Sequence, residues 1–345
     1  MRTMELKGRT GTCRIMLGES LSNLRDYCKG AKQIVAITDA NVRRCHGEKL
    51  KGLEIVEIGL GEENKTLATV EQLYKRLLEL EVGRSSFIIG VGGGIVCDVT
   101  GFTASTYLRG VPFSFGFVPT TLLAQVDASV GGKNGVNFMG YKNLVGDIRQ
   151  PEFCLCDFSL LGTLPEQEMR NGFAEIVKHA AMGDAGLFSY LEGSWHDAFS
   201  LRRTAIEKVV HDSLAVKIKI VSADEMERGE RMKLNFGHTL GHAVEKATGI
   251  QHGAAVSIGM VAAAKLSVLK SGLLEKDAER LGLLLEAIGL PTSVGADRGK
   301  ILDAIRKDKK RHGESIRMSL LEGIGKARIV EVGLGELEAV VDDMR

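Results

Sequence analysis

The sequence predicts an α/β N-terminal domain built on a parallel β-sheet, followed by a mostly α-helical C-terminal domain. In the first half of the chain, short β-branched runs alternate with segments of helical spacing. From about Thr163 onward, long helical stretches follow one another and strand-like runs nearly vanish. The length of 345 residues also fits about two domains, which we expect to span residues 1–162 and 163–345.

The elements of the N-terminal domain are predicted in chain order. Ile34–Ile37 is a buried parallel strand whose end, Thr38-Asp39, faces a ligand. Ile55–Ile58 is a second strand, Leu67–Leu80 a helix with apolar residues mostly at helical spacing, and Phe87–Ile89 a third strand. Strands that alternate with helices favour a parallel sheet with crossover helices.

The C-terminal domain is predicted from five stretches with apolar residues at i, i+3 and i+4, punctuated by Pro165 and Pro291. No linker is evident near residue 160, so we expect the two domains to pack closely, with the site in a cleft between them. The five stretches are Glu175–Ala181, Leu201–Ser222, Lys233–Thr248, Ala254–Lys270 and Lys276–Ile288.

The composition excludes several classes of function. Lys plus Arg is 45 and Asp plus Glu is 44, so no global field favours nucleic acid or a membrane. The six cysteines include no CxxC pair and are expected to be reduced thiols. The N-terminus lacks the apolar stretch of a signal peptide, and the longest apolar runs, Phe87–Cys97 and Ala254–Ala264, are too short to span a membrane. We therefore expect a soluble cytoplasmic protein.

A glycine-rich segment, Gly90–Gly94, directly follows the third predicted strand. Backbone N–H groups in such a turn can approach a pyrophosphate, and a helix that starts near Ile95 would direct its positive end toward it. Asp98 is placed to bind a ribose or substrate hydroxyl. A tight turn that needs no ligand accounts for the same glycines, and an acidic residue in a first turn also complements the helix dipole.

A polar segment, Pro119–Lys133, is followed by Gly140–Asn143. Together they bring hydroxyls, a carboxylate, a glycine pair and two lysines into a short stretch, which suits a polyhydroxylated, phosphorylated ligand. Solvated surface lysines are the alternative.

Glu175, His238, His242 and His252 form a third set. His238 and His242 are four residues apart and share a helix face, and His252 precedes a glycine at the start of the next helix. Two imidazoles and one carboxylate form a catalytic zinc set. An HxxxH pair is also common as surface or helix-packing histidine, and the spacing does not decide between them.

Read together, these segments resemble the 3-dehydroquinate synthases of the shikimate pathway. The resemblance extends over nearly the whole chain. It rests on Thr38–Asn41, Gly61–Lys65, Gly92–Gly94 with Asp98, Tyr107–Gly110, Pro119–Lys133, Lys142-Asn143, Leu164-Pro165, Phe173–Lys178, Leu234–His242, His252-Gly253 and Asp308–Lys310.

The resemblance implies a nucleotide-binding N-terminal domain for NAD and a C-terminal domain that holds one divalent metal ion, zinc or cobalt. The metal ligands would be Glu175, His238 and His252. The NAD residues would be Asp39, Asn41, Glu62, Lys65, Gly93, Gly94, Ile95, Val96, Cys97, Asp98, Thr120, Thr121, Lys133, Lys142, Leu160, Leu161, Gly162 and Thr163. The catalytic and substrate groups would be Arg109, Asp127, Lys133, Lys142, Asn143, Lys178, Lys217, Arg231, Asn235, His242, Lys309 and Lys310.

The same resemblance implies a lyase that converts 3-deoxy-D-arabino-heptulosonate 7-phosphate to 3-dehydroquinate and phosphate, a step of aromatic amino acid biosynthesis. NAD would oxidise the C5 hydroxyl, phosphate would be eliminated, and the hydride would return before an intramolecular aldol closure. NAD would thus act as a bound catalyst. The resemblance also implies a small sugar phosphate as the only partner, without nucleic acid or membrane, and a homodimer.

Two departures from the family pattern bear on this expectation. The family usually has HGEAV after the third ligand, whereas this chain has Ala254 in place of the glutamate. Loss of an outer carboxylate typically costs ~10–100-fold in metal affinity or activity, so we expect a weaker metal site. The segment from Arg109 to Pro119 is also about two residues longer than the family pattern, a length change that surface loops tolerate.

Three alternatives stay open. Other sugar-phosphate cyclases are disfavoured by Lys133 and Asp98. NAD- and metal-dependent glycerol or glycerol-1-phosphate dehydrogenases have no need of residues for a carboxylate, such as Lys178 and Arg231. A non-catalytic descendant is disfavoured because all three metal ligands are kept.

Many glycines adjoin the proposed residues, so we expect them to leave room for ligands; these are Gly92, Gly93, Gly94, Gly131, Gly132, Gly237, Gly241 and Gly253.

Overall fold

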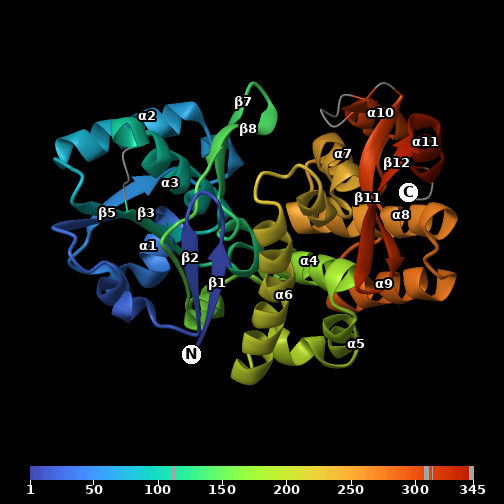
Figure 1. The fold of residues 1–345 in the computed structure, drawn as a ribbon, viewed down its shortest axis with the longest axis horizontal. Coiled ribbons are helices and arrows are strands. Elements are labelled where there is room, and N and C mark those ends of the chain that lie inside the picture. Colours follow the sequence, from blue (N-terminus) through green and yellow to red (C-terminus); the bar gives the residue numbers. More distant parts are fainter. Residues whose placement is uncertain (111–113, 307–310, 313, 342–345) are drawn as a thin grey trace. The chain divides into compact units, whose positions relative to one another are not determined.

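The computed structural model describes residues 1–110, 114–306, 311–312 and 314–341. The chain forms two compact units, Met1–Pro165 and Glu166–Arg345, which we call unit 1 and unit 2 (Figure 1). Each unit is described by itself.

Unit 1 is an α/β unit. Its described residues form a seven-stranded sheet in the order β1-β2-β9-β6-β5-β3-β4, in which only β1 and β2 pair antiparallel. The parallel sheet predicted from the sequence is therefore confirmed. The elements are β1 (Arg2–Lys7), β2 (Thr12–Leu17), β3 (Gln33–Asp39), α1 (Ala40–His46), β4 (Glu54–Ile58), α2 (Leu67–Glu79), β5 (Ser86–Gly92), α3 (Gly94–Thr106), β6 (Ser114–Pro119), β7 (Lys133–Phe138), β8 (Tyr141–Ile148) and β9 (Phe153–Cys156).

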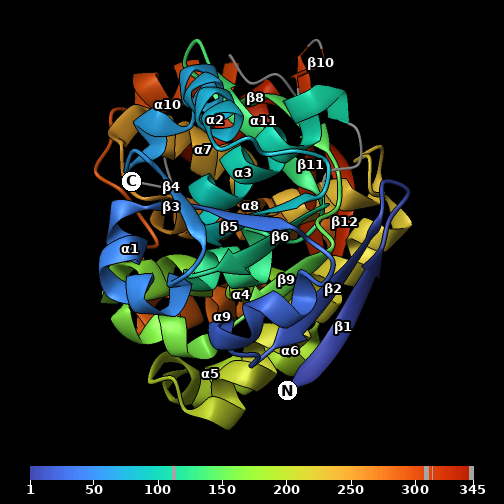
Figure 2. The ribbon, with the colours of Figure 1, turned by 90° about the vertical axis from the view of Figure 1, so that its left-hand side faces the viewer.

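The carboxyl ends of β3 and β5 lie side by side, because Ile37 pairs with Gly90 in parallel register. Helix α3 packs on β5 at close range: a Cβ added at Gly90 would lie 3.0 Å from Thr100 Oγ1. Strands β7 and β8 form a separate hairpin, which also contacts α3. Figure 2 shows the long β1–β2 hairpin at one edge of the sheet.

Unit 2 is mostly helical, as the sequence predicts. Its helices are α4 (Glu166–Gly183), α5 (Ala185–Phe199), α6 (Arg203–Ala223), α7 (His238–Thr248), α8 (His252–Ser271), α9 (Glu275–Ile288), α10 (Arg298–Arg306) and α11 (Leu334–Val341). Helix α8 is central, since it packs against α4, α7 and α9 and against the small sheet.

Two features of unit 2 differ from the sequence-based expectation. The described residues form a three-stranded antiparallel sheet of β10 (Arg311–His312), β11 (Ser315–Gly323) and β12 (Lys326–Gly333), where strands were not expected. The helix predicted over Lys233–Thr248 begins only at His238, because Gly237 adopts a left-handed conformation with φ 76° and separates α7 from a 3₁₀ turn.

Helix α8 is long and apolar enough to cross a membrane by length and composition. In the structure, however, 72% of its apolar window is buried, as in the core helix of a globular protein. The apolar run at Ala254–Ala264 therefore serves the core of unit 2.

Candidate active site

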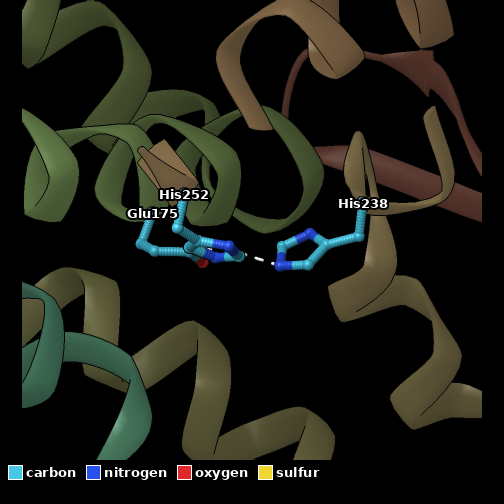
Figure 3. Close-up of side chains that lie close together, drawn as sticks. All are labelled: Glu175, His238 and His252. Atoms are coloured by element: carbon cyan, nitrogen blue, oxygen red, sulfur yellow. Dashed lines mark ion pairs between the residues drawn. The ribbon is translucent and has the colours of Figure 1, made fainter. Parts of the chain in front are cut away.

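Glu175, His238 and His252 lie together in unit 2, as the sequence motifs predict. They come from three different helices, α4, α7 and α8, and their side chains point toward one another (Figure 3). Glu175 Oε1 lies 3.6 Å from His238 Nε2 and 3.4 Å from His252 Nε2. The carboxylate is fully buried, and Lys178, one turn further along α4, forms an ion pair with it.

The geometry of this cluster fits one divalent ion. Ligand atoms about 2.0–2.2 Å from a tetrahedral zinc ion lie roughly 3.3–3.6 Å from one another, which matches the two distances from Glu175 Oε1. Both oxygens of Glu175 are buried, and apart from the ion pair of Oε2 with Lys178 neither has a hydrogen-bond partner among the described residues. Oε1, which faces the two imidazoles, is thus a buried carboxylate oxygen without a hydrogen-bond donor, and such an oxygen is suited to ligate a cation.

The electrostatics of the cluster keep Glu175 and His238 in the forms that bind a metal. Burial raises the pKa of the Glu175 carboxyl, but the Lys178 ammonium and the His238 and His252 imidazoles hold it well below its ordinary value. Burial, reinforced by Lys178, lowers the pKa of His238 well below its ordinary value. Glu175 is thus ionised and His238 neutral. Burial lowers the pKa of His252, but the nearby Glu175 and Glu245 carboxylates raise it to about 9.

Glycines set the distance between the helices that carry the histidines. A Cβ added at Gly259 of α8 would lie 2.0 Å from the carbonyl oxygen of Gly237, and one at Gly241 of α7 would lie 2.8 Å from that of Ala255. At the start of α8, a Cβ on Gly253 would meet the α4 backbone. These glycines therefore let three helices approach closely enough for their side chains to share a site.

The expectation that glycines leave room for ligands is wrong for Gly237, Gly241 and Gly253. The space beside each of them is filled by the backbone of a neighbouring helix. Spacing in the sequence does not distinguish the two cases, because both require a residue without a side chain.

Other predicted groups of unit 2 lie on the elements around this cluster. Lys217 is buried on α6. Arg231 is buried in the 3₁₀ turn Glu230–Asn235, where its Nη1 donates to the carbonyl oxygen of Glu225. Asn235 donates to Glu227 Oε1. His242 is exposed, one turn along α7 from His238, with ring centroids 5.2 Å apart.

In unit 1 the predicted phosphate turn joins β5 to α3. Among the described residues no side chain caps α3, whose N-cap is Gly93. The uncapped N–H groups of this helix, with its positive dipole end, suit a pyrophosphate. Local packing also requires glycines in this turn. A Cβ on Gly92 would lie 2.5 Å from the Val96 side chain, and one on Gly94 would lie 3.0 Å from Ala128 Cβ.

A polar cluster forms beside α3. The buried Lys65 Nζ pairs with Asp98 and donates to Asn143 Oδ1 at 2.6 Å. Burial lowers the pKa of Lys65, but the Asp98 carboxylate outweighs burial and raises it above its ordinary value. Lys142 Nζ lies 4.0 Å from Glu62 Oε1. The structure thus brings together five residues that were predicted for cofactor and substrate.

The remaining predicted residues of unit 1 are distributed over several elements. Asp39 ends β3 and caps α1 by accepting from Val42 N at 2.9 Å. Thr163 contacts His46 Nε2 at 3.0 Å. The others are Asn41 at the start of α1, Ile95, Val96 and Cys97 in the first turn of α3, Arg109 after α3, Thr120 and Thr121 after β6, Asp127 in a π-helical turn, Lys133 at the start of β7, and Leu160, Leu161 and Gly162 after β9.

Lys309 and Lys310 lie outside the described residues. In the longer segment that follows Arg109, residues 114–119 form β6 and are not loop, and residues 111–113 lie outside the described residues.

Sequence reasoning missed Asn137 and Glu245. Asn137 Nδ2 donates to Glu62 Oε1 at 2.8 Å, and its Oδ1 accepts from Asn143 N at 2.9 Å, so it joins two predicted residues. Glu245 Oε2 lies 3.5 Å from His252 Nδ1. The available signal for Glu245 was its position seven residues after His238, two turns along the same helix face.

Comparisons with known proteins give one family. Residues 55–171 match the family model "3-dehydroquinate synthase N-terminal", and residues 172–311 match "3-dehydroquinate synthase C-terminal". A 3-dehydroquinate synthase of Dehalococcoides mccartyi (strain CBDB1) is 42% identical over 328 residues, which cover 92% of this chain and 90% of the relative.

Two solved structures share the whole fold. A 2-deoxy-scyllo-inosose synthase complexed with carbaglucose-6-phosphate, NAD⁺ and Co²⁺ has a TM-score of 0.88 and 27% identity, with 100% of both chains covered. The 2-epi-5-epi-valiolone synthase ValA from Streptomyces hygroscopicus subsp. jinggangensis 5008, with NAD⁺ and Zn²⁺ bound, has a TM-score of 0.87 and 28% identity, covering 100% of this chain and 99% of that one. These solved structures are other cyclases, whereas the family models and the sequence relative agree on one activity, and the chain belongs to the 3-dehydroquinate synthase family.

Proposed function

We propose that the chain converts 3-deoxy-D-arabino-heptulosonate 7-phosphate to 3-dehydroquinate and phosphate, as a lyase of the shikimate pathway that uses NAD and one zinc or cobalt ion. The observation that carries the proposal is the buried Glu175 carboxylate with two imidazole nitrogens within 3.6 Å of one of its oxygens. Relatives named 3-dehydroquinate synthase, such as that of Dehalococcoides mccartyi, support the choice of substrate.

Glu175, His238 and His252 would hold the metal ion. When bound, a zinc or cobalt ion supplies Lewis-acid stabilisation of negative charge on the substrate's C5 oxygen. Lys178 neutralises Glu175 from the other side of the carboxylate, so the ligand set is held by a buried ion pair before the ion enters.

His242 is suited to move the proton of the substrate hydroxyl. It lies one helical turn from His238, its side chain is exposed, and it is not part of the Glu175 cluster. A neutral imidazole can accept that proton at one ring nitrogen and return it later in the cycle.

Cationic groups would hold the phosphate and the carboxylate of the substrate. Lys178, Lys217 and Arg231 are buried in unit 2, where a positive charge interacts strongly with an anion. Arg109, Lys133 and Lys142, with Asp127, Asn143 and Asn235, would orient the rest of the substrate, and so would Lys309 and Lys310.

Unit 1 would hold NAD. The uncapped start of α3 at Gly93 would receive the pyrophosphate, and Asp39, at the end of β3, would accept from a ribose hydroxyl. Glu62 and Lys65 would hold the second ribose region beside Asp98. When bound, NAD supplies reversible hydride acceptance at C5, so no net NADH forms.

We also propose that the protein acts in the cytoplasm and as a homodimer. The cytoplasmic assignment follows from the soluble metabolites that the reaction uses. Sedimentation of the purified protein would report the oligomeric state directly, and a monomer at micromolar concentration would contradict the dimer.

The function is tested with purified protein, NAD, zinc or cobalt, and the heptulosonate phosphate. We expect one phosphate released per substrate, 3-dehydroquinate as the product, and no accumulation of absorbance from NADH. Sugar phosphates without a carboxylate, such as glucose 6-phosphate and sedoheptulose 7-phosphate, serve as matched controls and should not turn over. Stoichiometric NADH would indicate a dehydrogenase, and no turnover with either metal would contradict the proposal.

A further inference from the structure

His252 lies between two carboxylates from different helices. Its Nε2 is 3.4 Å from Glu175 Oε1, on the side of the metal cluster. Its Nδ1 is 3.5 Å from Glu245 Oε2. Only the first carboxylate belongs to the predicted ligand set, so the second one needs its own explanation.

The fold directs Glu245 to this place. Glu245 follows His238 by two turns of α7, so both side chains share the face that meets α8. The crossing of α7 and α8 is fixed by direct backbone contact at Gly241 and Gly259. The Glu245 side chain is only 14% exposed, so it is not an ordinary solvated surface glutamate.

A histidine that ligates a metal through Nε2 carries its proton on Nδ1 and needs an acceptor for it. We propose that Glu245 is the positioning residue of the metal centre, accepting the Nδ1–H of His252 and thereby presenting its Nε2 to the ion held with Glu175 and His238. The inference rests on the metal assignment in the proposed function. It adds a residue of this chain that fixes the orientation and tautomer of one ligand.

With Glu245 in this role, the metal site does not need a carboxylate at position 254. Position 254 is two residues after His252 on α8, and side chains two apart on a helix do not face each other. Ala254 is also buried, so a glutamate there would have to fit inside the packed unit. The outer carboxylate for His252 comes from α7, and the alanine does not remove it.

Glu245 also lies close to His242, and these two residues with Nδ1 of His252 are near enough to one another to surround a second ion. That arrangement would need a lone pair on both nitrogens of His252. A neutral imidazole has only one, so the hydrogen-bonding role is favoured. The two roles predict different metal stoichiometries.

The test compares Glu245→Ala and Glu245→Gln with the wild type, and uses Glu279→Ala, an exposed glutamate on α9, as the matched control. Zinc affinity is measured by competition with a chromophoric chelator, and the site geometry by the visible absorption of the cobalt-substituted protein. We expect one metal per chain in all four proteins. Affinity should fall ~10–100-fold in Glu245→Ala, with a shifted cobalt band, and not at all in Glu279→Ala.

Glu245→Gln should bind more tightly than Glu245→Ala, because the amide oxygen still accepts the Nδ1–H. Unfolding of the metal-free proteins is measured in parallel to detect any loss of folding. If Glu245→Ala does not fold, the metal affinity of Glu245→Gln is compared with that of the wild type. Wild-type affinity and spectrum in Glu245→Ala, or two metals per wild-type chain, would overturn the inference. A wild-type protein that binds no metal would instead overturn the metal assignment of the proposed function.

Discussion

Asn143 has a left-handed backbone conformation that its neighbours hold in place. Its φ of 50° lies in the left-handed region, which is uncommon for residues other than glycine. Lys65 Nζ donates to its side chain, and Asn137 Oδ1 accepts from its backbone N–H. The same Asn137 donates to Glu62, so one amide links a proposed substrate residue to a proposed cofactor residue.

Asn137→Ala should therefore weaken the binding of both NAD and substrate. Two hydrogen bonds are lost, each worth about 0.5–1.5 kcal/mol, so the dissociation constant for NAD should rise roughly 5–150-fold. Asn137→Asp separates the two bonds, because it keeps the acceptor for Asn143 N but places a carboxylate beside Glu62. Fluorescence titration with NAD measures the change, and equal affinity in wild type and Asn137→Ala would contradict this role.

His252→Ala should lose both bound metal and activity, because the variant removes an imidazole from a three-residue ligand set. Metal content after dialysis, measured by elemental analysis, checks the prediction. His211→Ala is a suitable control, since that histidine lies on α6 and contacts Asp212. One metal per chain in His252→Ala would show that His252 is not a ligand.

The individual site residues were predictable to different degrees. Glu175, His238 and His252 could be predicted as a ligand set because they match motifs of a known family. Their spatial arrangement could not be predicted, because it depends on how three helices pack. Asn137 and Glu245 act through other residues, and such roles depend on pairings that no local spacing reveals.

At the scale of elements, the contact between α7 and α8 brings two of the proposed metal ligands together. Gly241→Ala should separate these helices, because its Cβ would lie 2.8 Å from the carbonyl oxygen of Ala255. We expect the free energy of unfolding to fall by about 1–3 kcal/mol, which lowers the melting temperature by ~2–4 °C per kcal/mol. Metal binding should weaken as well. Thermal unfolding and zinc titration measure both effects.

Gly282→Ala, in the interior of α9, provides the control for this prediction. Nothing lies within 4 Å of a Cβ added there, so alanine should stabilise the helix by up to ~1 kcal/mol. A Gly241→Ala variant that behaves like Gly282→Ala would show that the helices do not need their close contact.

The elements that were predicted correctly have strong periodicity, and those that were missed have weaker or interrupted signals. Strands β3, β4 and β5 and helices α2, α8 and α9 follow the predicted ranges closely. The β1–β2 hairpin was missed because the alternation in β2 is short: Cys13 and Ile15 are buried on either side of the exposed Arg14, but the following residues are all buried. The start of α7 was placed too early because helical spacing of apolar residues continues through Gly237, whose φ of 76° interrupts the helix.

At the scale of the whole molecule, the two proposed cofactors belong to different units. All three proposed metal ligands lie in unit 2, and the proposed pyrophosphate turn lies in unit 1. Zinc should therefore increase hydrogen-exchange protection in α4, α7 and α8, and NAD should do so in β3, β5 and α3. Mass spectrometry of peptides resolves the two patterns, and zinc protection of β3 and β5 equal to that of α7 would contradict the assignment.

Removal of the metal should lower the thermal stability of unit 2. An ion at 100 times its dissociation constant stabilises the folded state by ~2.7 kcal/mol, because the ligands of α4, α7 and α8 meet only when folded. Calorimetry with zinc and with a chelator measures the shift, and Glu175→Gln should show none. An equal shift in that variant would place the ion elsewhere.

The strand order of unit 1 also determines when its sheet can be completed during synthesis. Strand β9, at residues 153–156, lies between β2 and β6, so the N-terminal hairpin joins the other strands only after β9 has left the ribosome. At ~5–20 residues per second, roughly 7–28 s pass between the synthesis of β2 and that of β9. During that interval the edges of β2 and β6 are open to other chains, and a nascent-chain chaperone would have its greatest effect there.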